Sequence, residues 1–211
     1  MSWIGFDVNH SCSAEVASKI VPYAEYMTAF PSDAPSSGWN YSFLKDLQLD
    51  RDGAETGKRI IDASSENLQD RSVDLSCLDL SEMETVDIAV DAYFEKITAH
   101  LDENTFLQLE ALMSAAAKNS ITDSPDLTDL ISLCECYEQV DPEALAAIKD
   151  AVRRAVVTHH SAETSGLSIC HPLHHQKDDY DEWCQAYHLL GFCPGYSSYI
   201  DALKPYLTAQ H

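Results

Sequence analysis

Basic side chains are scarce in this sequence of 211 residues. Lysine and arginine together number 13, against 35 aspartates and glutamates, so the formal net charge is -22 at pH 7. Such a surface repels phosphate backbones and anionic lipid head groups, because both carry dense negative charge. We therefore expect no nucleic-acid partner and no membrane partner. A basic peptide would suit this charge, although plain solubility is its commoner use.

Long apolar runs are lacking as well. No run approaches the roughly 18 apolar residues that a membrane span needs, and no basic segment followed by an apolar one stands at the N-terminus. We expect a soluble chain without a signal peptide, whose compartment the sequence leaves unknown. The composition is 45% hydrophobic, which is enough for a buried core. Without internal repeats or low-complexity linkers, residues 1–211 are expected to form a single unit.

The cysteines lack the paired spacing of a disulfide framework or a zinc ribbon. They number seven and are scattered along the chain, so a mostly reduced state is expected. Cys134 and Cys136 are two residues apart on an expected helix and thus lie on different faces. That spacing argues against a shared metal ion.

Potential metal ligands do gather at residues 170–175, which read CHPLHH. Zinc needs about four convergent ligands, whereas Cys170 and His171 are neighbours on an expected strand and would point to opposite faces. His174 and His175 fit a loop pair, and the pair at residues 159–160 lies near an expected helix end, where a cation has an electrostatic use. We therefore expect no metal and no other cofactor.

Apolar spacing predicts an α/β protein with few strands and many helices. Residues 3–7 predict a buried strand, and a helix capped by Ser13 follows a sharp turn. Further strands are expected at residues 26–30, 72–78 and 166–170, and further helices at 42–49, 55–63, 82–101, 103–118, 127–138, 142–157, 178–191 and 196–207.

The segment after the start of the first strand carries a resemblance to a known family. Residues 4–17 read IGFDVNHSCSAEVA, which resembles, without a gap, the segment IGFDACLMGSxEVA of the clostripain family of cysteine peptidases. Further markers follow in the family's order: VPYAEYM at residues 21–27, GWNY at 38–41, VDLS at 73–76 and SGLSICHP at 165–172. The resemblance covers nearly the whole chain and corresponds to the C-terminal part of the family's peptidase domain. It implies a partial caspase-like sheet, largely parallel, with flanking helices.

The same resemblance puts Asn9 at the position of the family's cysteine nucleophile. An amide cannot form the thioester through which cysteine-peptidase catalysis passes. The family's catalytic histidine lies on an earlier strand, and none of the nine histidines here aligns with it. We therefore expect a truncated, diverged clostripain-like segment without proteolytic activity of its own.

Asp7 matches the family aspartate that is associated with an acidic pocket for arginine or lysine. A carboxylate at a strand end can bind a guanidinium through two parallel hydrogen bonds, so the resemblance makes Asp7 a candidate for substrate binding. The alternative is a turn or capping aspartate without a ligand. Asn40 stands where the family's GWDY motif has aspartate, which would weaken a preference for basic side chains.

Cys12 is a candidate for a displaced nucleophile, with His10 or another histidine as its base. If the helix begins at residues 9 to 12, a shift of three residues moves the sulfur about 4.5 Å along the axis. Catalysis tolerates much less error than that, so a buried or idle thiol is the expected state.

Two other kinds of function remain open. One is a non-catalytic binding module, a pseudo-peptidase that holds a basic peptide at Asp7 or pairs with a separately encoded N-terminal half. This hypothesis predicts an exposed apolar sheet edge or face near Trp3 and Phe6. The other is a metal-binding helical protein with its ligands in residues 170–175.

Overall fold

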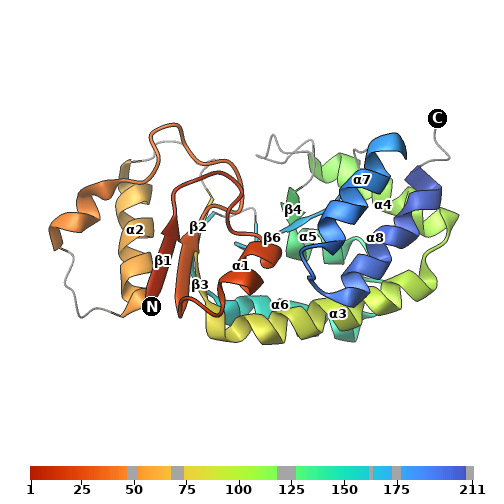
Figure 1. Cartoon of the computed structure of the whole chain (residues 1–211), viewed down its shortest axis with the longest axis horizontal. Helices are drawn as coiled ribbons and strands as arrows, with labels where there is room; N and C mark the ends of the chain where they lie inside the picture. Colours follow the sequence, from red (N-terminus) through yellow and green to blue (C-terminus); the bar gives the residue numbers. More distant parts are fainter. Residues whose placement is uncertain (47–51, 68–73, 118–126, 162–163, 173–176, 208–211) are drawn as a thin grey trace.

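The computed structural model describes residues 1–46, 52–67, 74–117, 127–161, 164–172 and 177–207. A main sheet lies toward one end of the elongated molecule, and a group of long helices lies toward the other (Figure 1). The N-terminus lies beside the sheet (Figure 1). No helix in the described ranges is long and apolar enough to cross a membrane.

The main sheet has four strands in the order β1 (Trp3–Phe6), β2 (Tyr26–Ala29), β3 (Leu75–Asp79) and β5 (Val156–His160). The pair β1 and β2 is parallel, with α1 (Ala14–Ile20) between them in sequence, whereas the pairs β2–β3 and β3–β5 are antiparallel. The sheet is therefore mixed, not largely parallel as the family resemblance implied. Strands β1, β2 and β5 all end at one edge, where β3 begins, and we call this the carboxyl edge.

Two apolar cores lie on opposite faces of the main sheet. Helix α2 (Gly53–Asn67) contacts all four strands and covers the face with the smaller core. The larger core joins the other face to α1, α3 (Met83–His100) and α6 (Pro142–Ala155). Strand alternation explains the division, because neighbouring residues point to opposite faces: Cys77 belongs to the smaller core and Leu78 to the larger one.

A second, smaller sheet joins the main sheet to the helical end. Strand β4 (Leu127–Asp129) pairs antiparallel with β6 (Ser168–Cys170), and a single bridge between Ser13 and Ser168 ties β6 to the start of α1. Figure 1 shows α1 and β6 side by side in the middle of the molecule. The remaining elements are η1 (Tyr41–Asp46), η2 (Leu80–Glu82), α4 (Glu103–Ala117), α5 (Leu130–Glu135), α7 (Lys177–His188) and α8 (Pro194–Leu207).

Aromatic side chains dominate the helical end. Helices α3 and α8 pack together, and Phe94 is fully buried with its ring centroid 4.6 Å from that of Tyr196 and 4.8 Å from that of Tyr199. The Phe94–Tyr196 pair meets edge to face at 78°, an arrangement that adds to the stabilisation from apolar burial. This end therefore supplies a rigid base for the rest of the chain.

The helix-rich α/β prediction is confirmed, but three expected elements differ. Residues 127–129 form β4, not helix, because Asp129 caps α5 by accepting from the Ser132 N–H at 2.9 Å. The expected helix over residues 142–157 ends at Ala155 and β5 follows, in a run rich in β-branched residues. The described part of the expected helix 42–49 is the 3-10 helix η1. A single unit over residues 1–211 stays a prediction.

Candidate functional site

The turn from β1 into α1 lies at the carboxyl edge. His10 adopts a left-handed backbone with a φ of 55°, unusual for a residue with a side chain. This bend directs the N–H groups of His10 and Cys12 to the carbonyls of Ser32 and Phe30, each at 2.9 Å. Ser13 then caps α1 by accepting from the Val16 N–H at 3.3 Å, as predicted. The chain beyond β2 thus holds the turn in place.

Asn9 is exposed in this turn, just beyond the end of β1. Its side-chain oxygen accepts a hydrogen bond from the Ala34 N–H at 3.0 Å. In an open α/β sheet, residues that follow strand ends converge on the ligand crevice. The structure therefore puts Asn9 where the resemblance expects a nucleophile, while its correspondence to the family cysteine stays a prediction.

The Asp7 carboxylate is bound within the chain. It accepts from the Trp39 N–H at 3.1 and 3.2 Å and from the Tyr41 hydroxyl at 2.7 Å. Gly38 makes the contact possible: its φ is 64°, and a Cβ there would lie 2.5 Å from an Asp7 oxygen. The hydrogen bond from the Tyr41 hydroxyl to Asp7 raises the pKa of Tyr41, because the phenolate that forms on deprotonation would face the negative carboxylate. The geometry therefore favours the alternative that Asp7 is a turn aspartate without a ligand, since a guanidinium would have to displace the Tyr41 hydroxyl.

Asn40 fixes the same loop to α2. Its side-chain N–H donates to the Ala63 carbonyl at 2.7 Å, and its oxygen accepts from the Ser42 N–H at 3.0 Å. Aspartate could not donate the first of these bonds. The amide at this position is therefore adapted to holding the loop.

Cys12 and His10 do not form a catalytic pair in the part of the chain that the structure describes. His10 Nε2 lies 2.9 Å from Asp33 Oδ1, whereas the Cys12 thiol donates to the Gly166 carbonyl at 3.6 Å. Cys12 is 0% exposed, and burial raises the pKa of its thiol well above the usual value, with a further contribution from Asp74. A protonated, inaccessible thiol is a poor nucleophile, so this geometry favours the idle state.

Sequence analysis missed a polar cluster at the carboxyl edge, formed by the buried Asp74 and the half-buried His159 and Thr164. His159 Nε2 lies 3.1 Å from Asp74 Oδ1 and 3.1 Å from Thr164 Oγ1, and the threonine hydroxyl donates to Asp74 Oδ2 at 2.6 Å. A carboxylate can only accept, so the imidazole carries its proton on Nε2. Because residues 156–157 were assigned to a helix end, the β3–β5 pairing that brings these residues together could not be foreseen.

The proposed metal ligands do not converge in the described residues. His171 is buried, and its ring stacks on Tyr199 at a centroid distance of 5.9 Å. His174 and His175 lie outside the described residues. Cys134 is buried on α5, and Cys136 directly follows the helix. Within the described ranges, no group of three or more histidine, cysteine or acidic side chains is placed to hold a metal ion.

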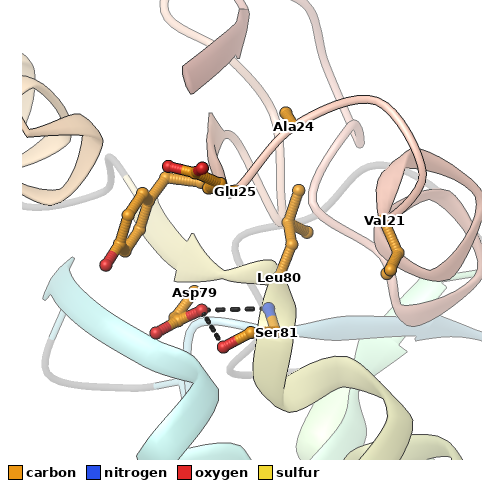
Figure 2. Close-up of a pocket in the computed structure, with 7 residues that line it drawn as sticks. Val21, Ala24, Glu25, Asp79, Leu80 and Ser81 are labelled. Atoms are coloured by element: carbon orange, nitrogen blue, oxygen red, sulfur yellow. Dashed lines mark hydrogen bonds between the residues drawn. The ribbon is translucent and has the colours of Figure 1, made fainter. Parts of the chain in front are cut away.

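A cavity of about 430 Å³ lies at the edge of the main sheet opposite the carboxyl edge (Figure 2). Its lining combines apolar side chains with the carboxylates of Glu25 and Asp79, and Asp79 accepts from both the N–H and the hydroxyl of Ser81. The strands separate this cavity from Asn9. It contributes nothing to the candidate peptidase site. The lining residues are Val21, Ala24, Glu25, Tyr26, Asp79, Leu80 and Ser81.

Solved structures share this fold. An inactive zymogen protease from Parabacteroides distasonis aligns with a TM-score of 0.65 at 15% identity, over 94% of this chain and 58% of its own. A cysteine protease from B. fragilis aligns with a TM-score of 0.66 at 14% identity, over 98% of this chain and 89% of its own. A clostripain from Bacteroides thetaiotaomicron, solved with a peptide inhibitor, aligns with a TM-score of 0.61 at 16% identity, over 94% and 87%.

These alignments confirm the partial caspase-like fold. The chain spans little more than half of the zymogen structure. A search of curated protein sequences finds no match. The sequence model of the clostripain family, in contrast, matches residues 1–197, which is most of the chain. The chain therefore belongs to the clostripain family.

Proposed function

We propose that this chain is a truncated, diverged member of the clostripain family that has no proteolytic activity of its own. The observation that carries the proposal is Asn9, exposed beyond β1 at the carboxyl edge, where an amide replaces the expected sulfur. An amide side chain does not attack a peptide carbonyl to form an acyl-enzyme. Coverage of only 58% of the zymogen chain supports truncation, whereas coverage of 89% of the B. fragilis protease chain does not.

The nearest thiol does not compensate for Asn9. Cys12 is fully buried, and its thiol donates to the Gly166 carbonyl. His10 is held by Asp33 instead. Losing either member of a cysteine–histidine couple removes most of the rate acceleration, and Cys12 and His10 do not form such a couple.

An amidolytic assay tests this proposal. The purified chain is incubated with fluorogenic arginine and lysine amides, beside the variant Asn9→Ala and an active clostripain as a positive control. We expect turnover at the buffer rate for both forms of the chain. Turnover above the buffer rate that iodoacetamide abolishes would overturn the proposal. If the same turnover persists in Asn9→Ala, the nucleophile is a residue other than Asn9.

A second candidate function is a binding module for a basic peptide or for a separately encoded N-terminal half. Within the described residues, β1 pairs with β2 alone, so its outer backbone groups stand at the edge of the sheet. The rings of Trp3, the buried Trp39 and the exposed Tyr41 follow one another, with successive centroids 6.2 and 6.3 Å apart, and the first two lie over Gly5 of this strand. An edge strand flanked by aromatic rings suits an added strand, and the charge of -22 favours a cationic one.

Two measurements test the binding module. If a lysine of the peptide takes the place of the Tyr41 hydroxyl at Asp7, fluorescence anisotropy with a labelled octapeptide of alternating lysine and threonine should show binding that Asp7→Asn weakens at least about 5-fold and Glu138→Gln leaves within about 2-fold. Equal losses of affinity in the two variants would mean that the peptide responds only to the net charge of the chain, which contradicts the proposal. Hydrogen exchange should show faster exchange at β1 than at β2, whereas equal protection would mean that the edge is already covered.

A further inference from the structure

We infer that residues 164–168 form a strap, latched by Asp74 on one side and Asp129 on the other, whose local release exposes the thiol of Cys12. This inference goes beyond the proposed function, because it concerns a conformational device and not peptide hydrolysis. The strap connects three parts of the fold: the main sheet, the small sheet and the turn into α1. Four sets of contacts support it.

The strap covers Cys12 directly. The Cys12 thiol donates to the Gly166 carbonyl at 3.6 Å, and the Cys12 carbonyl accepts from both the N–H and the hydroxyl of Ser168, each at 3.1 Å. Cys12 is 0% exposed, although Asn9, three residues earlier, is exposed. The strap is therefore part of what separates this thiol from solvent.

Asp74 forms the first latch, from the main-sheet side. Its two oxygens accept from the Thr164 hydroxyl at 2.6 Å and from His159 at 3.1 Å. The Asp74 side chain is 1% exposed, so the carboxylate depends on these donors in place of water. The closed strap thus gives the buried Asp74 carboxylate one of its hydrogen-bond donors.

Asp129 forms the second latch, from the small-sheet side. One of its oxygens accepts from both the N–H and the hydroxyl of Ser165, each at 2.6 Å. The other caps α5 through the N–H of Ser132 at 2.9 Å. One carboxylate therefore links the strap to the start of a helix.

Gly166 shows that the closed position is tightly constrained. Its φ is 86°, and a Cβ there would lie 2.7 Å from Ser76 Oγ and 3.1 Å from the His159 ring. The Ser76 hydroxyl beneath it is buried and has no hydrogen-bond partner in the described residues. A buried hydroxyl without a partner destabilises the closed state, and water would reach it once the strap opens. The closed state therefore carries a penalty that opening relieves.

The strap is held chiefly by polar contacts. Leu167 contributes a fully buried apolar side chain, whereas Thr164 and Ser165 are held by carboxylates through charge-assisted hydrogen bonds. Breaking a few such bonds costs less than unfolding the aromatic core of α3 and α8, so the strap can open while the rest stays folded. Cys12 should then react by local opening.

Native-state alkylation tests the strap. The whole chain is treated with iodoacetamide, and the rate at each cysteine is read by peptide mass spectrometry. Thr164→Val removes the hydroxyl that binds Asp74, and we expect it to speed alkylation of Cys12 about 10-fold. Ser165→Ala, which weakens the Asp129 latch, should act in the same direction. The matched control is Thr158→Val on β5, which lies outside both latches and should leave the rate unchanged.

Cys77 is the internal reference, because it is also 0% exposed but lies on β3 in the smaller core, away from the strap and from α5. A rise at Cys12 without a rise at Cys77 supports the strap. Parallel rises at Cys12 and Cys77 would mean global unfolding and would overturn the inference. Unchanged Cys12 rates in both latch variants, with native circular dichroism, would overturn it as well. The readout does not depend on turnover, so it stands apart from the peptidase assay.

Discussion

The exposed turn that carries Asn9 and the buried strap beneath it meet at Cys12, yet the structure constrains them very differently. Asn9 reaches the Ala34 N–H at the surface, whereas Thr164 and Ser165, both half-buried, bind the carboxylates of the buried Asp74 and the half-buried Asp129. The strap keeps the family-like letters SGLS, while the turn reads NHS where the family pattern has CLM. By this resemblance the strap keeps the family pattern, and the turn departs from it at the position that we propose for the lost nucleophile.

If that contrast is correct, substitution of the buried residue Glu15 should give the largest loss in the free energy of unfolding. This carboxylate, 3% exposed in the first turn of α1, accepts from the Cys170 N–H at 3.0 Å and from the Tyr187 hydroxyl at 2.9 Å. Glu15→Ala removes the acceptor of both donors, and because the Tyr187 hydroxyl is buried, the free energy of unfolding should fall by about 2–4 kcal/mol in urea titrations.

The control for Glu15 is Glu138→Ala, at an exposed position beyond α5. It should change the free energy of unfolding by less than about 0.5 kcal/mol. Equal effects of the two substitutions would show that Glu15 does not tie α1 to β6 and α7, and the contrast between interior and surface would fail.

The second-largest loss of stability is expected for a substitution at Gly166. Gly166→Ala combines a left-handed backbone with a methyl group 2.7 Å from Ser76 Oγ, so a loss of about 2–3 kcal/mol is expected from chemical denaturation. Gly191→Ala is the matched control, because its φ is 58° but its nearest neighbour lies 3.9 Å away. It should lose only about 1 kcal/mol, from the backbone alone. A smaller loss at Gly166 than at Gly191 would show that the strap is not tightly packed.

The loop that Asp7 holds should give a smaller effect. Tyr41→Phe removes the hydroxyl that binds Asp7, and because the ring is 52% exposed we expect a loss of about 0.5–1 kcal/mol near neutral pH. The raised pKa of Tyr41 sets the sign: this contribution is present below the ordinary tyrosine pKa and is lost as the pH rises through the folded value. Urea titrations at neutral and alkaline pH should show the two proteins converging.

How far the sequence predicted these features depends on the range of the contacts. The strand, turn and capped helix around Asn9 follow from local spacing and were predicted, as were the long helices α3 and α4. The cluster of Asp74, His159 and Thr164 joins residues 85 and 90 positions apart and depends on the pairing of β3 with β5. The β-propensity of a segment does not tell which distant strand it pairs with, so the sequence alone could not predict this cluster.

The smallest effect should come from the position that resembles the family nucleophile. Asn9→Ala removes one hydrogen bond at the surface, so the free energy of unfolding should change by less than about 0.5 kcal/mol, with Asn9→Asp, which keeps the acceptor, as control. A loss above about 1.5 kcal/mol in Asn9→Ala alone would make Asn9 a structural anchor of the turn. The asparagine would then be explained by stability, and its place at the carboxyl edge would no longer point to a lost nucleophile.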